Sequence, residues 1–468
     1  MKERPSASLT EGPITRSILL FTGPLIIGNL FQQLYNTTDS FIVGNFVGSG
    51  ALAAIGASAQ IINLFIGFII GLTTGAGIII AQYYGAGDGT RLHSAVHTSF
   101  CFCILGGILV SIAGCLLSPL ILTAMNTPSS VIPDAALYLR VYFLGALFNI
   151  LYNMGAGTLQ AAGDTKHPLY CLCLSSVINV VLDIVFVTVF HMAVLGVALA
   201  TLIAQLVSAA CVLWKLTHTD DIYRLIPSKI HSDKAMLIKI LKFGIPTGLQ
   251  TAVTSLSNVI VQSYLNGFGS LAMAGSNIYG KVDSFALLPA NCLSLTTTTY
   301  IAQNMGARKF DRVKQGFKQF LWLGNLYAAA IGILLFFFSA GPLRLFTAAP
   351  EVVHYGAMMG QVLGPGYILL ITCQILIGTA RGAGDTFSTM LLSILNLCGL
   401  RILWLTIMIP FFPSIYTLYL GYPVTWGTAA VCMGIYYCKK IKPRLQRVRQ
   451  AHCPRKSFAF EKSFNTLS

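Results

Sequence analysis

The chain has 468 residues, of which 55% are hydrophobic and only 10% charged, and 30 Lys and Arg against 15 Asp and Glu give a net charge of +15. Soluble domains carry about 25% charged residues, so this composition excludes a water-soluble enzyme, a disordered chain and a disulfide-rich secreted scaffold. It is typical of a polytopic helical membrane protein, in which the basic excess reflects the bias of Lys and Arg toward cytoplasmic loops.

Twelve apolar segments follow one another along the chain, each long enough to cross a bilayer as a helix. They span residues 15–43, 51–83, 94–118, 134–161, 168–190, 194–216, 236–265, 271–304, 316–340, 352–380, 387–411 and 416–438. The runs are continuous rather than alternating, which disfavours a β-barrel. The first segment is too long for the core of a signal peptide, so we expect it to remain as a helix.

The basic residues indicate how these segments are oriented. With the N-terminus inside, 26 of the 30 Lys and Arg lie in the predicted inner segments, so both termini are expected to be cytoplasmic. The expected domains are an N-terminal lobe of six helices (1–217), a cytoplasmic connector (218–235), a C-terminal lobe of six helices (236–438) and a basic cytoplasmic tail (439–468). We expect the tail to lie along anionic lipid headgroups rather than on nucleic acid.

The first span contains polar residues that do not belong in lipid. Asn36 and Asp39 are three residues apart and share a helix face, and Tyr35 precedes them. An ionisable side chain within a span is costly and indicates a functional site by default. Pro24 in the same span predicts either a functional hinge or a static kink.

A second polar face lies in the fifth span, where Asn179 and Asp183 are four residues apart, and Thr201 follows in the sixth. Together with Asp39, two carboxylates in a low-dielectric site favour proton binding, because burial and mutual repulsion oppose their ionisation. The same oxygens, with those of Asn36, Asn179 and Thr201, are equally suited to a hard cation such as Na⁺. The alternative is a structural role, in which each Asp accepts hydrogen bonds from a neighbouring helix.

Two Ala-Gly-Asp-Thr turns, at residues 162–165 and 383–386, each follow a span on the inner side. No Gly-Lys-Ser/Thr motif accompanies them, so we interpret each as a helix end followed by the cap of the next helix.

The cysteines and histidines show no convincing metal-binding pattern. Eleven of the 12 cysteines lie inside apolar segments, at spacings that do not match zinc ligands, and we interpret them as small apolar filler. His93 and His97 lack nearby carboxylate or thiol partners and are interpreted as a solvated loop end. No metal is predicted beyond a possible Na⁺ at Asp39, Asn179, Asp183 and Thr201.

The second half of the sequence repeats motifs of the first in the same order. The segment ending in Pro24 matches one ending in Pro246, which makes Pro246 a second hinge candidate, and Asn36 falls on Asn258. Six spans per half start both halves on the same side, so a pseudo-twofold axis along the membrane normal relates them. Such halves enclose a central cavity, and rocking them against each other gives alternating access.

The second half differs from the first in its charges. Val261 falls opposite Asp39 and Trp404 opposite Asp183, so ion coupling is predicted in the N-terminal half alone. Arg401 interrupts an apolar span and either lines a cavity or clamps helix ends. The predicted substrate cavity contains Tyr35, Asn153, Tyr279, Lys281, Asp283, Tyr367 and Arg401. Any of these aromatic rings either stacks on a flat or cationic ligand or packs in the core.

The chain contains a set of short motifs: Gly23-Pro24, Gln32-Gln-Leu-Tyr-Asn36, Asp39-Ser-Phe-Ile-Val-Gly44, Ala51-Leu-Ala-Ala-Ile-Gly56, Ala81-Gln82 with Gly85, and the two Gly-Asp-Thr turns. Together these motifs resemble those of the multidrug and toxic compound extrusion (MATE) family. The pairing of Asp39 with Asn179 and Asp183 is similar to that of the DinF-like bacterial branch. The resemblance implies an antiporter of the bacterial inner membrane that exports cationic, lipophilic compounds in exchange for Na⁺ or H⁺.

We therefore predict an all-α, polytopic secondary multidrug antiporter with twelve transmembrane helices in two six-helix lobes. It is predicted to have no enzymatic activity and no cofactor, only a coupling ion, H⁺ or Na⁺. Its expected partners are small cationic or amphipathic substrates and membrane lipids, with no nucleic acid, and it is expected to work as a monomer. The alternatives are a flippase for lipid-linked oligosaccharide, which needs a more cationic cavity, and a membrane-embedded transferase, which needs a metal–carboxylate motif.

Overall fold

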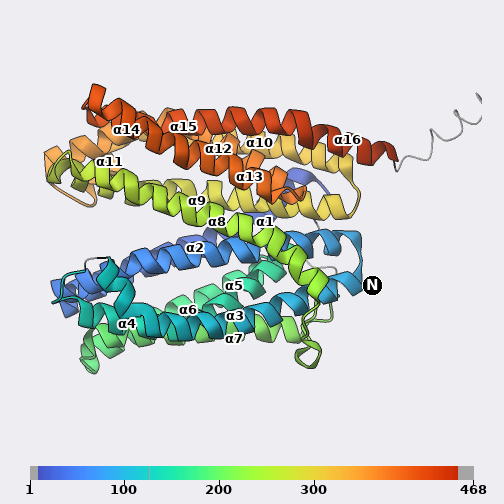
Figure 1. Cartoon of the computed structure of the whole chain (residues 1–468), viewed down its shortest axis with the longest axis horizontal. Coiled ribbons are helices and arrows are strands. Elements are labelled where there is room, and N and C mark those ends of the chain that lie inside the picture. The colour runs from blue at the N-terminus through green and yellow to red at the C-terminus, as the bar shows by residue number, and fades with distance from the viewer. Residues whose placement is uncertain (1–8, 126, 452–468) are drawn as a thin grey trace, which may run out of the picture.

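The computed structural model describes residues 9–125 and 127–451, and this part of the chain contains helices and no strand. Long apolar runs fold this way because a helix pairs its backbone N–H and C=O groups within one segment, as hydrocarbon surroundings require. The helices run side by side in two layers, with α2 to α7 in the lower layer of Figure 1 and α8 to α15 in the upper one.

The N-terminal lobe consists of α1 (Ile14–Ile42), α2 (Ser49–Ala86), α3 (Gly89–Ala124), α4 (Ile132–Leu144), α5 (Ala146–Ala161), α6 (Lys166–Ile184) and α7 (Ala193–Thr217). The C-terminal lobe consists of α8 (Lys234–Asn266), α9 (Ser270–Gly306), α10 (Phe310–Phe338), α11 (Ala340–Arg344), α12 (Pro350–Gly382), α13 (Thr386–Ser393), α14 (Arg401–Phe411), α15 (Ile415–Tyr436) and α16 (Lys442–Ala451). Four π-helical segments interrupt or extend these helices, at Val43–Val47, Val185–Val189, Ile394–Leu400 and Tyr437–Ile441, and a 3-10 turn lies at Pro227–Lys229.

Eight helices of the described chain are long and apolar enough to cross a membrane, or nine if α4 and α5, which meet at 46°, form one bent span. The helices α8, α9 and α15 have 33, 37 and 22 residues and lie in the same bundle, but they carry more polar and aromatic side chains. With them each lobe has six spans. The predicted all-α architecture of two lobes is therefore confirmed.

The two Gly-Asp-Thr turns have the predicted structure. Gly163 and Gly384 adopt φ angles of +100° and +92°, in the region that glycine enters without steric cost. The Asp164 carboxylate accepts the backbone N–H of His167 at 3.1 Å, and Asp385 accepts that of Ser388 at 3.1 Å. Each aspartate therefore caps the helix that follows the turn.

The first helix of each lobe begins in the core of the opposite lobe. On α1, Ile18 and Phe21 are fully buried in the hydrophobic cluster of the C-terminal lobe, whereas Ile42 belongs to a cluster of the N-terminal lobe. On α8 the arrangement is mirrored, with Ile240 in an N-terminal cluster and Val261 in the C-terminal one. Both helices therefore tie the two lobes together.

Hydrogen bonds attach the segments before α1 and α8 to the opposite lobe, at the end of the bundle that the charges predict to be cytoplasmic. Asn304 Nδ2 of the C-terminal lobe donates to the carbonyl of Leu9, just before α1, at 3.1 Å. In the connector before α8, the backbone N–H of Ile226 donates to His97 Nε2 at 3.0 Å. His97 is fully buried rather than part of a solvated loop end, because it docks the connector onto α3.

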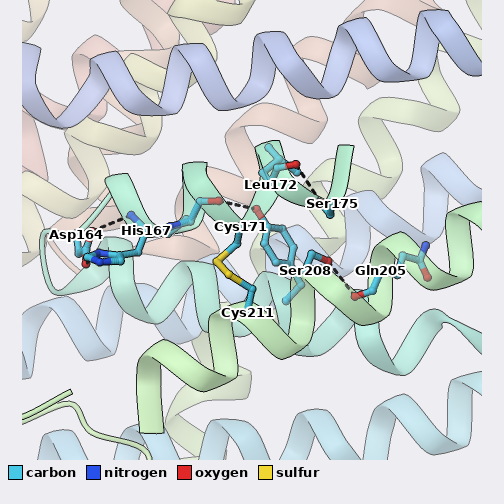
Figure 2. Close-up of a disulfide and its surroundings, with 10 residues drawn as sticks. Asp164, His167, Cys171, Leu172, Ser175, Gln205, Ser208 and Cys211 are labelled. Carbon is cyan, nitrogen blue, oxygen red and sulfur yellow. Dashed lines mark hydrogen bonds and ion pairs between the residues drawn. A yellow bond between two sulfur atoms is a disulfide. The ribbon is translucent and has the colours of Figure 1, made fainter. Parts of the chain in front are cut away.

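A disulfide joins Cys171 on α6 to Cys211 on α7, with the Cα atoms 5.7 Å apart (Figure 2). This Cα separation is an ordinary one for a disulfide. The interpretation of the span cysteines as apolar filler is therefore wrong for this pair. Forty residues separate the two in sequence, and only the packing of α6 against α7 brings them together.

Candidate functional site

Two carboxylates from different helices meet inside the N-terminal lobe. Asp39 on α1 and Asp183 on α6 lie close enough for their side chains to interact directly. Asp183 is fully buried, and Asn179 one helical turn earlier is 1% exposed. We call Asp39, Asn179, Asp183 and Thr201 the acid site. The side chain of Asn36, which sequence reasoning assigned to the same site, lies outside the part of the chain that the structure describes.

The acid site lies where two helices change geometry. Asp39 is four residues before the π-helical segment Val43–Val47, and Asp183 is two residues before Val185–Val189. A π-helical turn is energetically poorer than an α-helical one and is frequently found at functional sites. Both carboxylates therefore lie next to a π-helical segment, the kind of helix distortion that recurs at functional sites.

Apart from the contact between the two carboxyl groups, several polar atoms of the acid site have no hydrogen-bond partner among the described residues. They are both carboxylate oxygens of Asp183, Oδ1 of Asp39, and both amide atoms of Asn179. Leaving a buried polar atom unpaired costs about 1–3 kcal/mol, and more when the group is charged. A proton would remove the charge, and a cation such as Na⁺ would coordinate the oxygens, so the donor set fits either ion.

Three tyrosines, Tyr35, Tyr138 and Tyr142, surround the two carboxylates, and only Tyr35 was predicted from the sequence. Tyr35 and Tyr138 both interact electrostatically with Asp39 and Asp183, and Tyr142 interacts with Tyr138 in the same way. Tyr138 lies beside Thr201, which is 6% exposed.

Three residues in these surroundings, two of the tyrosines and a glutamine, were not predicted from the sequence. Tyr138 and Tyr142 on α4 are four residues apart, and Gln205, beside Tyr142, is four residues after Thr201 on α7. Such spacing places the members of each pair on one helix face and was the available signal.

A cavity of about 420 Å³ is lined by residues of α1 in the first half and α9 in the second. Its lining consists of Asn29, Gln32, Gln33, Asp283, Ser284, Leu287, Leu288 and Asn291. Polar amides therefore come from α1, and a single carboxylate comes from α9. This mixture can accept a substrate that carries one positive charge on an otherwise uncharged body.

Asp283 is held in this cavity by buried aromatic residues. Its carboxylate accepts a hydrogen bond from the Tyr367 hydroxyl. The hydroxyls of Tyr367 and Tyr279 are 2.7 Å apart, and both residues are fully buried. The ring of Tyr367 stacks on Trp426, with the ring centroids 6.0 Å apart. Tyr279 and Tyr367 therefore position Asp283 from behind and do not line the cavity themselves.

Other predicted substrate residues lie elsewhere. Lys281 is exposed, and its Nζ lies 5.8 Å from the centroid of the Phe346 ring. Asn153 on α5 donates to the backbone carbonyl of Asn149 at 2.8 Å, inside the N-terminal lobe. Arg401 is buried in the C-terminal lobe with 4% exposure.

The two lobes contact each other beyond the cavity through a pair of matching hydrogen bonds. Gln82 Nε2 on α2 donates to the carbonyl of Gly382 at 3.2 Å, and Gln303 Nε2 on α9 donates to the carbonyl of Ala161 at 2.7 Å. The two lobes therefore contact each other at the end that the charges predict to be cytoplasmic. The hinge candidates Pro24 and Pro246 lie inside α1 and α8, the helices that cross between the lobes.

Comparisons with known proteins agree with the repeat and the fold. The MatE family model matches residues 24–185 and again 246–407, so the two matches have the same length and start at Pro24 and Pro246. The probable multidrug resistance protein YoeA of Bacillus subtilis (strain 168) is 30% identical over 437 residues, covering 91% of this chain and 93% of that protein. The probable multidrug resistance protein NorM of Thermotoga maritima is 24% identical, covering 85% and 86%. A solved structure of a multidrug resistance MATE family transporter in an outward-facing conformation has a TM-score of 0.89 at 20% identity, covering 96% of this chain and all of that one.

Proposed function

The chain belongs to the MatE family, and on that premise we propose that it is a secondary antiporter exporting cationic, lipophilic compounds in exchange for H⁺ or Na⁺. Several of its relatives are named for multidrug resistance or multidrug export. The proposal places this multi-pass membrane protein in the bacterial inner membrane as a working monomer with both termini cytoplasmic. It keeps the boundaries 1–217, 218–235, 236–438 and 439–468. The tail beyond residue 451 lies outside the described residues.

One observation carries the proposal: the acid site and the inter-lobe cavity share helix α1. Asp39 belongs to the acid site, and Gln32 and Gln33 line the cavity about two helical turns earlier. An ion that binds at Asp39 therefore acts on the same helix that the substrate touches. Outside its contact with Asp39, the buried Asp183 carboxylate has no hydrogen-bond partner among the described residues, which favours loading of that ion.

The transport cycle follows from this shared helix. In the outward-facing state the acid site takes up an ion, α1 changes shape between Pro24 and Asp39, and the cavity loses affinity for the substrate. In the inward-facing state the ion leaves and a new substrate binds. Because coupling between sites is reciprocal, a substrate in the cavity weakens ion binding by the same factor, typically 5- to 150-fold.

Transport in proteoliposomes tests the proposal, with a Na⁺ gradient and a pH gradient imposed separately. Asp39→Asn and Asp183→Asn are expected to abolish substrate movement driven by the coupling ion. Asp283→Asn is the matched control, because it removes a carboxylate from the cavity but not from the acid site. It should weaken binding of a cationic dye while leaving the response to the ion. Undiminished coupled transport in both acid-site variants would contradict the assignment. No observation favours the flippase or the transferase.

A further inference from the structure

A buried arginine stands without a carboxylate partner in the C-terminal lobe. Arg401 at the start of α14 donates to Asn258 Oδ1 at 3.4 Å and to Thr425 Oγ1 at 3.3 Å. Its Cζ lies 4.4 Å from the centroid of the Tyr422 ring. Among the described residues no carboxylate forms an ion pair with it, and its Nε has no partner. A buried charge held only by neutral groups is expensive, so packing alone does not explain its presence.

The internal repeat gives this position a counterpart in the acid site. In the register that aligns the two family matches, Asn258 falls on Asn36 and Arg401 falls on Asn179. Thr425 lies on α15, the sixth span of its lobe, as Thr201 lies on α7, the sixth span of the other. One group that binds the guanidinium, Asn258, is therefore the C-terminal counterpart of Asn36, and the other, Thr425, lies on the span equivalent to that of Thr201.

The two acids are absent from this counterpart. In the same register Val261 replaces Asp39 and Leu405 replaces Asp183, and both are buried, with 4% and 1% exposure. Trp404 lies opposite Asp183 only if the register of the two Gly-Asp-Thr turns is extended without a gap. The π-helical segment Ile394–Leu400 lies between the second turn and Arg401. Such a segment accommodates one additional residue, which moves the counterpart of Asp183 from Trp404 to Leu405.

We propose that Arg401 is a fixed cation that fills the C-terminal counterpart of the acid site, so that only the N-terminal lobe exchanges ions with solution. The inference rests on the proposed function of the acid site. The fixed charge holds α8, α14 and α15 together through Asn258 and Thr425 at every stage of transport. In the N-terminal lobe the corresponding contacts among α1, α6 and α7 depend on an ion that binds and dissociates during each transport cycle.

Chemical rescue tests the fixed charge. Arg401→Ala should lower ion-coupled transport in proteoliposomes by about tenfold or more, the effect expected from losing a hydrogen-bonded buried charge. Guanidinium at a non-denaturing concentration should restore much of that loss, and urea, its neutral isostere, should not. Arg401→Lys, which keeps the charge, should retain most of the activity. Wild-type activity in Arg401→Ala, or equal rescue by urea, would overturn the proposal, because the charge would then be dispensable.

Counting ions on the wild-type chain keeps the proposal testable if Arg401→Ala does not fold. Equilibrium binding of ²²Na⁺, and proton uptake measured in weak buffer, should show one exchangeable ion per chain that Asp183→Asn removes. A second exchangeable ion that survives Asp39→Asn and Asp183→Asn would overturn the role of Arg401 while leaving the antiport proposal intact. Binding of no ion at all would instead refute the proposed function itself.

Discussion

Replacing Gly306 by alanine is expected to force the two lobes apart at the contact where α2 and α9 end. Gly306 ends α9, and a Cβ built there would lie 1.9 Å from the carbonyl oxygen of Gln82 on α2. Gly85 repeats the arrangement, with a Cβ position 2.0 Å from the carbonyl oxygen of Gln303. The obstructing atoms are backbone and cannot rotate away, so the helices must separate by roughly 1.5 Å or more to reach ordinary contact distance.

The cost of this clash can be worked out from the contacts involved. Overpacking a well-packed contact costs about 1–3 kcal/mol. The separation also stretches the 2.7 Å hydrogen bond from Gln303 to the carbonyl of Ala161, which is worth about 0.5–1.5 kcal/mol. A combined penalty of about 3 kcal/mol lowers the ratio of forms closed at this contact to forms open at it by roughly 100-fold or more.

Distances between the lobes report this shift directly. Spin labels at the exposed positions Thr90 and Lys314 in nanodiscs, measured by double electron–electron resonance, should show a longer population in Gly306→Ala. Labelling through an unnatural amino acid avoids the 12 cysteines. Gly280→Ala on the same helix is the control, because a Cβ there meets nothing within 4 Å. If Gly306→Ala gives the same distances as the wild type and Gly280→Ala, the lobes do not close through this contact.

Two further changes test the connections that hold the helices in place. Reduction of the disulfide should lower the melting temperature of the wild type, because Cys171 and Cys211 close a loop of 40 residues, a link worth about 2–4 kcal/mol. The Cys171→Ser variant should already melt at that lower temperature, with or without reductant. A wild-type melting temperature that reductant does not change would contradict the disulfide. In the connector, hydrogen bonds from the backbone N–H of Met236 and the hydroxyl of Ser94 hold the pKa of Asp233 below its usual value. Its contribution to stability is therefore complete above pH about 4 and is lost as the pH falls through the lower native pKa. Asp233→Asn should flatten the fall in melting temperature below pH 4, and an equally steep fall in both proteins would show that this carboxylate is not responsible.

The sequence predicted the features that depend on local patterns. Apolar runs predicted the helices, and the repeat predicted the two lobes. The turns around Gly163 and Gly384 were correct in detail, because a glycine with positive φ followed by a capping aspartate is a local signal. The proximity of Asp39 and Asp183 could also be predicted from the sequence. Carboxylates within membrane spans are rare and face the interior of the bundle, where they pair with other polar groups.

Features that arise from packing between distant segments were not predictable. The pairing of Cys171 with Cys211 depends on the rotation of α6 about its axis, which apolar composition does not determine. The burial of His97 depends on the connector folding back to donate from Ile226. The correct counterpart of Asp183, Leu405, required knowledge of the π-helical segment that shifts the register by one residue.

The first helix of each lobe begins in the core of the other lobe, and this arrangement constrains the order in which the chain can fold during synthesis. During synthesis α1 enters the bilayer long before α9 and α10 exist, so Ile18 and Phe21 must face lipid or the insertion machinery until the second half emerges. Neither half can complete its own core alone, because Ile240 is still missing from the first when residue 217 leaves the ribosome. Biogenesis therefore has a late docking step in which two unfinished halves complete each other. Separately expressed halves should accumulate only when both are present in the same membrane.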